Sequence, residues 1–148
     1  MDKVRYAVCL GIVVLFLLSC CRVAAVFPDP GVTNETAESY FKRTSLYVGE
    51  FRTTFYCACR KCCGKDESHP GYGVTASGER VQAGRTIAVD PAVIPLGSDV
   101  LLRWSDGNYA WRVATDTGVR GKSVDVYMEE HDAALRAGVQ VTDVWWRG

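Results

Sequence analysis

The sequence predicts a mainly β domain, a small six-stranded barrel with one short helix. Several short runs rich in β-branched and aromatic residues follow one another, separated by Gly, Pro and Asp clusters. A single segment has a helical pattern with matching end signals. These features lie within residues 51–148, which we predict to be one domain large enough for one hydrophobic core. Many short strands with a lone helix favour a barrel over a sandwich.

The first half of this domain contains two predicted strands. Arg52–Cys57 is rich in Thr and aromatic residues, which favour strands. A loop rich in Cys and Gly follows and runs to Tyr72. Thr86–Asp90 is a short apolar run stopped by Pro91, so we predict a buried strand there.

The second half begins with a predicted hairpin. Asp99–Trp104 and Tyr109–Thr115 are two strand-like runs on either side of the turn sequence Ser105–Asn108. Ser123–Met128 is a further strand-like run. We therefore expect the hairpin and this strand to contribute three strands to the sheet.

The end of the domain contains the predicted helix and the last strand. Glu129–Ala137 has acidic residues in its first turn, alanines at helical spacing and Arg136 near its end. Gly138 supplies the stop signal. Val139–Trp146 alternates in polarity, so we expect it to close the sheet.

Three aspartates lie in similar settings. Asp90 (TIAVDP), Asp116 (VATDTG) and Asp125 (KSVDVY) each follow a small or β-branched apolar run. Each is therefore predicted to lie at or near a strand end, where Asp is unfavourable by propensity. A turn cap explains any one of them alone. The three together favour an acidic site, in which neighbouring carboxylates raise one another's pKa.

The motifs around these aspartates resemble those of a known family. They are TASG (Thr75–Gly78), AVDP with IPLG (Ala88–Gly97), AxDTG (Ala114–Gly118) and DVY (Asp125–Tyr127). Residues 51–146 resemble the bacterial 3D (three-aspartate) domain. That family includes the C-terminal part of membrane-bound lytic transglycosylase A and the stationary-phase muralytic proteins. The resemblance implies a double-psi-like β-barrel and an enzyme that cleaves peptidoglycan glycan strands.

The resemblance also implies a set of site residues. Asp125, Asp116 and Asp90 form the expected catalytic set. Within it, Asp125 is the acid/base, Asp116 orients and tunes it, and Asp90 acts chiefly as a structural cap. A lytic transglycosylase needs one such acid, whereas a hydrolase needs a second carboxylate to activate water or attack the sugar. The aromatic and polar residues expected to contact the glycan are Tyr72, Thr75, Trp111 and Tyr127.

The segment from Asp116 to Asp125 departs from the family pattern. It is shortened by two residues, which places Arg120 and Lys122 near the expected site. A close cation would lower the pKa of the acid and oppose catalysis; alternatively, both are solvated loop charges. Two other functions therefore stay open: a non-catalytic glycan-binding barrel, and a disulfide- or metal-bearing envelope protein.

Four cysteines lie within seven positions: Cys57, Cys59, Cys62 and Cys63. In an exported protein we expect two disulfides among them and no cofactor. A tetrathiolate zinc site is the second reading, with His69 as a substitute ligand, and a catalytic thiol is the third. The other histidine, His131, is expected to be exposed.

Residues 1–25 have the pattern of an export signal. Lys3 and Arg5 precede the apolar run Tyr6–Leu18, which is shorter than a typical membrane span. Cleavage after Ala25, acylation of Cys20 after cleavage at a lipobox, and an uncleaved anchor all stay open. Residues 26–50 are expected to be a linker. We therefore expect a protein of the bacterial envelope, in the periplasm or at the outer membrane, that contacts membrane only through this segment or a lipid on Cys20.

The charge balance limits the choice of partner. The 148 residues include 17 basic and 17 acidic side chains and no basic stripe. Nucleic acid is therefore excluded as the expected partner. By the resemblance, the expected partner is the peptidoglycan glycan strand.

Overall fold

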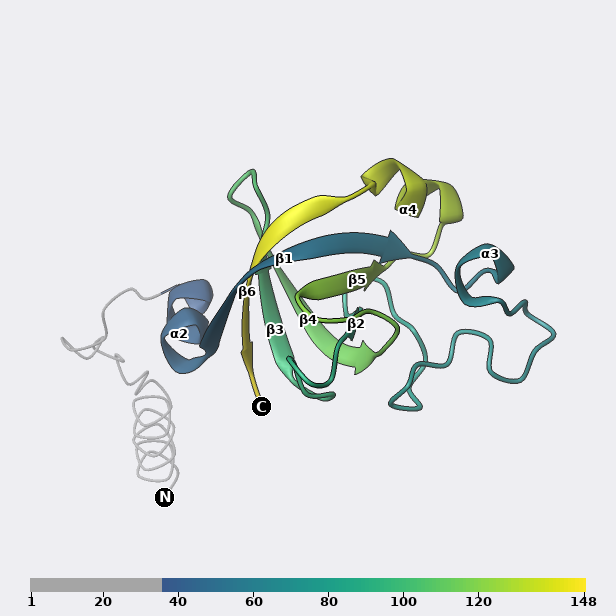
Figure 1. Ribbon diagram of the computed structural model, residues 1–148, viewed down its shortest axis with the longest axis horizontal. Helices are drawn as coiled ribbons and strands as arrows, with labels where there is room; N and C mark the ends of the chain where they lie inside the picture. Colours follow the sequence, from purple (N-terminus) through teal and green to yellow (C-terminus); the bar gives the residue numbers. More distant parts are fainter. Residues whose placement is uncertain (1–35) are drawn as a thin grey trace, which may run out of the picture. The chain divides into compact units, whose positions relative to one another are not determined.

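The computed structural model describes residues 36–148, so the predicted export signal and Cys20 lie outside the described residues (Figure 1). No helix within residues 36–148 is long and apolar enough to cross a membrane. The elements are α2 (Ala37–Thr44), β1 (Leu46–Tyr56), α3 (Arg60–Cys63), β2 (Thr86–Val89), β3 (Asp99–Arg103), β4 (Tyr109–Asp116), β5 (Ser123–Tyr127), α4 (His131–Ala137) and β6 (Gln140–Arg147).

The six strands form a closed barrel in the order β1-β5-β2-β4-β3-β6, which confirms the predicted fold class. β1 runs parallel to β5, and β2 runs parallel to β4. The other four neighbouring pairs are antiparallel. Because the barrel closes on itself, no strand has an unpaired edge.

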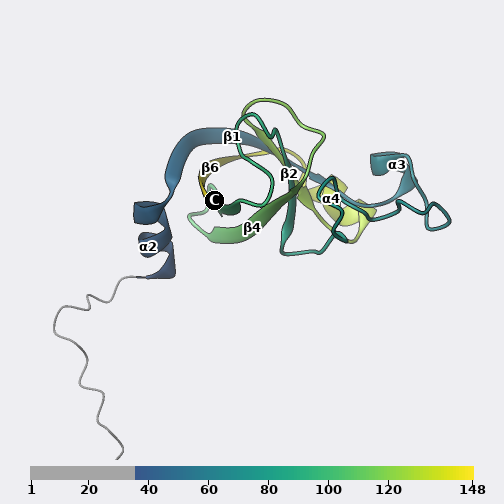
Figure 2. The same ribbon diagram turned by 90° about the horizontal axis from the view of Figure 1, so that it is seen from below.

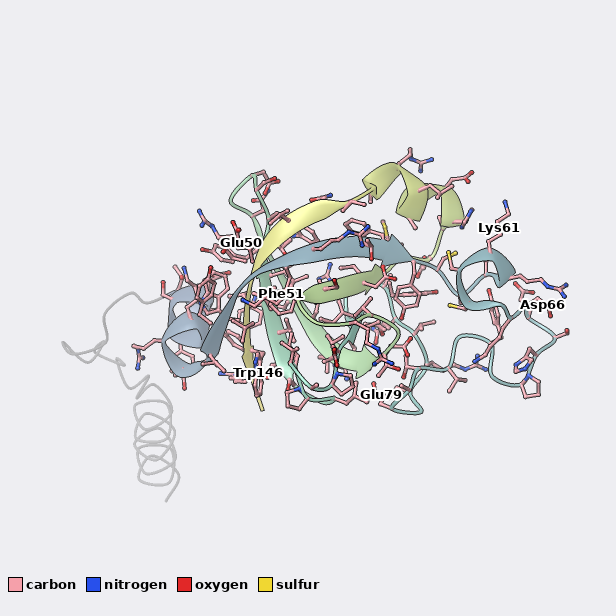
Figure 3. The ribbon with its side chains drawn as sticks, in the orientation of Figure 1. Glu50, Phe51, Lys61, Asp66, Glu79 and Trp146 are labelled. Atoms are coloured by element: carbon pink, nitrogen blue, oxygen red, sulfur yellow. The ribbon has the colours of Figure 1, made fainter. Side chains whose placement is uncertain are left out.

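The core fills the barrel interior. Alternate residues of each strand point inward, so Phe51 of β1 is buried while its neighbour Glu50 is exposed (Figure 3). Ten buried side chains form this core: Phe51, Ile87, Val89, Ile94, Val100, Leu102, Ala114, Val124, Val126 and Val144.

The predicted hairpin and the last helix are present. β3 and β4 pair antiparallel from Asp99 opposite Val113 to Arg103 opposite Tyr109, and the turn between them contains Gly107 with a φ of 87°. α4 begins at His131, two residues after the predicted start, with Glu130 in an extended conformation as its N-cap. It ends before Gly138, as predicted.

The N-terminal boundary of the domain differs from the prediction. Residues 37–50, expected to be linker, form α2 and the first part of β1. Phe41 is fully buried against Leu101 and Trp145, and its ring meets the ring of Trp111 edge-on at 4.7 Å. α2 is short and mostly polar, so it resembles a linker in composition, although Ala37, Tyr40 and Phe41 are spaced to lie on one helical face.

The helices lie at opposite ends of the barrel. α2 lies at one end, while α3 and α4 lie together at the other, as the two perpendicular views agree (Figures 1 and 2). α3 belongs to the Cys-rich loop, which we expected to have no helix. This loop covers a second, smaller apolar cluster of Tyr56, Ala58, Ala88 and Tyr127, with Tyr72 and Val81 packed against it. The end with α3 and α4 is therefore the end that the long loop encloses.

Phe41→Ala tests whether α2 is part of the folded domain. Removing a fully buried Phe side chain should lower the free energy of unfolding by about 3 kcal/mol. Urea denaturation followed by circular dichroism measures it. The matched control is Tyr40→Ala, since Tyr40 is 51% exposed on the same helix and should change stability little. Equal effects of the two substitutions would contradict the assignment of α2 to the domain.

Candidate functional site

Two of the three aspartates face each other across β2. In the strand register, Ala88 lies opposite Asp125 on one side and Asp116 on the other, and Thr54 lies opposite Asp125. Thr54, Asp125, Ala88 and Asp116 therefore form one row across four adjacent strands, which we call the aspartate row. With strands about 4.8 Å apart, the Cα atoms of Asp116 and Asp125 are roughly 10 Å apart.

A β-bulge puts Asp116 in this row. Ile87 pairs with Ala114, but the next residue, Ala88, pairs with Asp116, so β4 contains one extra residue, Thr115. Ala114 faces the core. Without the bulge Asp116, two residues later, would face the core too, because side chains alternate with a period of two. The bulge turns its carboxyl to the outer face, where Asp125 lies.

Asp125 has few hydrogen-bond donors. Its Oδ1 accepts a hydrogen bond from the Thr54 hydroxyl at 2.9 Å. Burial raises the pKa of Asp125, the Thr54 bond and the charge of Arg52 oppose that rise, and the charge of Asp116 adds to it. Its neighbours Val124 and Val126 point into the barrel core, on the other face of β5.

Asp116, in contrast, is surrounded by donors. Its Oδ1 accepts backbone N–H bonds from Ala76 at 3.0 Å and Thr117 at 2.9 Å, and its Oδ2 accepts the Tyr56 hydroxyl at 2.9 Å. Burial and the Asp116 charge together raise the pKa of Tyr56. Three donors fix Asp116 as an acceptor and attach the Thr75–Gly78 motif to the barrel.

Asp90 is a structural cap, as the sequence indicated. Its Oδ1 accepts the Ala92 N–H at 3.0 Å and its Oδ2 accepts the Gly121 N–H at 2.7 Å. These two bonds lower the pKa of Asp90, with a smaller contribution from the charge of Arg120. Asp90 therefore connects the end of β2 to the loop before β5.

The structure agrees with the second reading of Arg120 and Lys122, that of solvated loop charges. Both side chains are exposed. The charge of Arg120 acts on Asp90, and the Lys122 ammonium lies beside Gly49. The charge that acts on Asp125 is Arg52, on the neighbouring strand β1. Neither Arg52 nor Thr54 could be found from the sequence, because nothing in it gives the β1–β5 register.

A cleft of about 250 Å³ opens beside Asp116. Tyr56, Asp116 and Thr117 form its barrel side. The long loop forms the other side with Ala58, Cys62, Cys63, Lys65, Gly71, Gly73, Val74 and Val81. Asp125 lies in the adjoining strand rather than in the cleft wall.

The expected glycan-contacting residues divide into two groups. Tyr72 and Tyr127 lie at the aspartate end, where Tyr127 meets Tyr56 edge-on at 5.5 Å. Trp111 instead packs against Phe41 of α2. Thr75 is buried, and its hydroxyl donates to the Glu79 carbonyl at 3.1 Å, which holds the loop in place.

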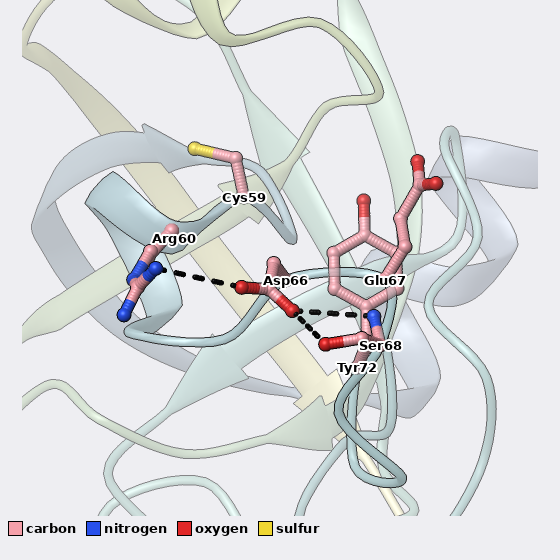
Figure 4. Close-up of a pocket in the computed structure, with 6 residues that line it drawn as sticks. All are labelled: Cys59, Arg60, Asp66, Glu67, Ser68 and Tyr72. Carbon is pink, nitrogen blue, oxygen red and sulfur yellow. Dashed lines mark hydrogen bonds and ion pairs between the residues drawn. The ribbon is translucent and has the colours of Figure 1, made fainter.

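Tyr72 also lines a second, open hollow of about 540 Å³ on the long loop (Figure 4). Asp66 organises this hollow by accepting hydrogen bonds from the hydroxyl and N–H of Ser68 and by pairing with Arg60 at 3.6 Å. The two hydrogen bonds from Ser68 lower the pKa of Asp66, the hydroxyl most of all, with a smaller contribution from the charge of His69. The hollow is open to solvent on the side where Tyr72 lies.

The cysteine cluster departs from the prediction in two ways. The two disulfides are not formed, because Cys57, Cys59, Cys62 and Cys63 are all free thiols. The histidine beside them is His131, half-buried at the start of α4 rather than exposed. Its Nδ1 lies 3.6, 3.5 and 3.6 Å from the Sγ atoms of Cys57, Cys59 and Cys62.

The remaining members of the Cys-rich loop are outside this group. His69 accepts a hydrogen bond from the Gly71 N–H at 2.9 Å, within its own turn. The Cys63 thiol donates to the Cys57 carbonyl at 3.3 Å and faces the cleft beside Asp116. Burial raises the pKa of the Cys57 thiol to about 12, while its hydrogen bond lowers the pKa of Cys59.

Part of the described region matches a known protein family. Residues 85–146, which run from β2 into β6 and include all three aspartates, match the 3D domain. The barrel begins before the matched residues, because β1 closes it and lies on their N-terminal side.

Two relatives from Bacillus subtilis (strain 168) share this region. YabE, named for cell wall shaping, is 35% identical over 104 residues, which cover 69% of this chain and 24% of YabE. The cell wall-binding protein YocH is 38% identical over 77 residues, covering 49% of this chain and 25% of YocH. The chain thus spans about a quarter of the length of these relatives.

Solved structures similar to the chain include lytic transglycosylases. MltA from Escherichia coli is 27% identical, with a TM-score of 0.44 over 55% of this chain and 29% of that chain. LtgG of Burkholderia pseudomallei is 31% identical, with a TM-score of 0.42 over 49% of this chain and 25% of that chain.

The opposite pKa shifts of Asp90 and Asp125 predict opposite effects on stability. Because the pKa of Asp90 is lowered in the folded state, its ionised form stabilises the fold above the ordinary pKa of about 3.9. That stabilisation is lost as the pH falls through the lowered pKa. Asp90→Asn should therefore lower the melting temperature at pH 7, and the gap from wild type should narrow on acidification.

Asp125→Asn should have the opposite effect on the melting temperature. The pKa of Asp125 is raised in the folded state, so the folded protein becomes less stable as the pH rises above the ordinary pKa of about 3.9 and Asp125 has to ionise. Asn keeps the shape without ionising, so its melting temperature at pH 7 should match or exceed wild type. Thermal melts of both variants from pH 3 to pH 8 measure these effects; a destabilised Asp125→Asn at pH 7 would contradict the assigned burial.

Proposed function

We propose that this 3D domain cleaves peptidoglycan glycan strands in the manner of a lytic transglycosylase, with Asp125 as the acid/base. The observation that carries the proposal is the contrast among the three carboxyls. Asp116 accepts three hydrogen bonds and Asp90 accepts two from backbone N–H groups, whereas Asp125 accepts the hydrogen bond of the Thr54 hydroxyl. Burial raises the pKa of Asp125, whereas backbone N–H bonds lower the pKa of Asp90.

The reaction requires one carboxyl that holds a proton and then takes one back. Protonated Asp125 donates to the oxygen of the glycosidic bond as that bond breaks. The resulting carboxylate accepts the proton of the sugar's own 6-hydroxyl, whose oxygen closes a 1,6-anhydro ring. The proton count balances and water is not consumed, so no second carboxylate has to activate water.

Asp116 supports this acid in the proposal. Its three donors hold it as an acceptor, and its charge favours the protonated form of Asp125. The same carboxylate keeps the Thr75–Gly78 motif against the barrel beside the cleft. A glycan lying along the aspartate row would then meet Tyr72 on the loop.

The proposed setting is the bacterial cell envelope. Two relatives of this region have names that refer to the cell wall, one for shaping it and one for binding it. The export signal expected in residues 1–25 would deliver the domain to that compartment. In this setting, acylation of Cys20 would attach the domain to a membrane of the envelope.

A second candidate function is glycan binding without cleavage. The observation that favours it is the positive charge of Arg52, which lowers the pKa of Asp125 and so opposes its role as an acid. The shortened segment between Asp116 and Asp125 points the same way, and the relative YocH is named as cell wall-binding.

Product analysis after incubation with purified peptidoglycan separates the two functions. We expect soluble fragments with 1,6-anhydro ends from the wild type, and release at least about a hundredfold lower from Asp125→Asn, the typical size of an acid/base contribution. The matched control is Asp99→Asn, an exposed aspartate whose ion pair with Arg147 contributes little. Reducing ends would indicate a hydrolase, and sedimentation with peptidoglycan without release would indicate a binder.

The pH profile tests the electrostatic part of the assignment. Activity should fall as the pH rises through the pKa of Asp125, because the acid loses its proton. Thr54→Val and Arg52→Gln each remove an interaction that lowers this pKa, so the alkaline limb should move to higher pH in both. Glu50→Gln, on the same strand, serves as the control. An unmoved limb in both variants would contradict Asp125 as the titrating acid.

A further inference from the structure

The thiols of Cys57, Cys59 and Cys62 converge on the imidazole of His131 at the loop end of the barrel. The four donor atoms all lie within 4.8 Å of one another. Two chain segments that are about 70 residues apart supply them. We propose that these four residues form a structural zinc site that attaches the long loop to α4.

The distances fit a tetrahedral ion. Zn–S bonds of about 2.3 Å and Zn–N bonds of about 2.0 to 2.1 Å give tetrahedral edges of about 3.8 Å between sulfurs and about 3.6 Å between sulfur and nitrogen. The Sγ atoms of Cys57 and Cys62 are 3.7 Å apart. The three distances from Sγ to His131 Nδ1 are 3.5 to 3.6 Å.

Hydrogen bonding alone does not account for this convergence. The Nδ1 atom of a neutral imidazole has either one proton or one lone pair, so it can make one such bond at a time. Three sulfurs nevertheless lie at nearly equal distances from it. One cation at the centre of the four donors satisfies all of them together.

The backbone builds the site from both sides. Cys57 follows the last residue of β1, Cys59 is the N-cap of α3, and Cys62 lies one turn later, with its N–H donating to the Cys59 carbonyl at 3.1 Å. On the other side, the Met128 N–H donates to the Tyr56 carbonyl at 2.8 Å. That bond holds the chain after β5 beside the chain after β1, three residues before His131.

The donor set indicates a structural rather than a catalytic ion. Four protein ligands complete a tetrahedron and leave no open position for water or substrate. Cys57 is buried, Cys59 and His131 are half-buried, and Cys62 is exposed, so the ion can enter from solvent. The bound ion would fix the loop that forms the far side of the cleft beside Asp116.

Metal analysis of the full chain, purified without a polyhistidine tag from zinc-supplemented cells, tests the proposal. We expect about one zinc per chain, and loss of at least nine-tenths of it in Cys59→Ser and His131→Asn. Cys63→Ser and His69→Asn are the matched controls and should retain the metal, since Cys63 faces the cleft and His69 turns back on Gly71. Circular dichroism of every variant confirms that it is folded.

Cobalt substitution provides a second readout that does not depend on variants. Co²⁺ added to the metal-free protein should give the intense visible bands of a tetrahedral ion with thiolate ligands, and His131→Asn should alter them. The proposal is overturned if the wild type binds neither ion. It is also overturned if the controls lose the metal as Cys59→Ser does, or if the unreduced protein contains a Cys57–Cys62 disulfide in place of zinc.

Discussion

The register of β2 is the constraint on which the rest of this structure depends. All four of its residues are buried, and the strand pairs with β4 on one side and β5 on the other. Its one-residue mismatch with β4 turns Asp116 out of the core and into line with Asp125. Shifting that register by one residue would place a carboxylate among the core valines, at a large desolvation cost. The fold therefore fixes the position of both carboxyls before any ligand is present.

The three aspartates differ because the fold gives them different numbers of donors. Backbone N–H groups donate to both Asp90 and Asp116, and at Asp90 these bonds lower the pKa. Asp125 lies in the middle of β5, where the backbone N–H groups are used in the sheet and a side chain must supply the hydrogen bond. Similar local sequences thus give one carboxyl held by a side-chain hydroxyl and two held by backbone N–H groups.

The Cys-rich loop complements the barrel by enclosing one of its ends. It contributes Tyr72 and Val81 to the apolar cluster beside Tyr56 and forms one wall of the cleft at Asp116. Most of its backbone hydrogen bonds are local turns, and the Ser77 N–H donates to the Thr115 carbonyl of β4 at 2.9 Å, so side-chain contacts also help to set its position. The convergence of three thiols on His131 supplies such contacts at the point where the loop leaves β1.

The sequence by itself determined the β class, the hairpin, the last helix and the Asp90 cap, because these depend on local periodicity and on turn residues near in the chain. It could not give α2, which has a single buried aromatic, or the partners Thr54 and Arg52 of Asp125. From the sequence we predicted disulfides among the cysteines, whereas in the structure three of them lie around His131. Those contacts join residues about 60 to 70 positions apart, and only the closing of the barrel, through strand register and a bulge, decides which of them meet.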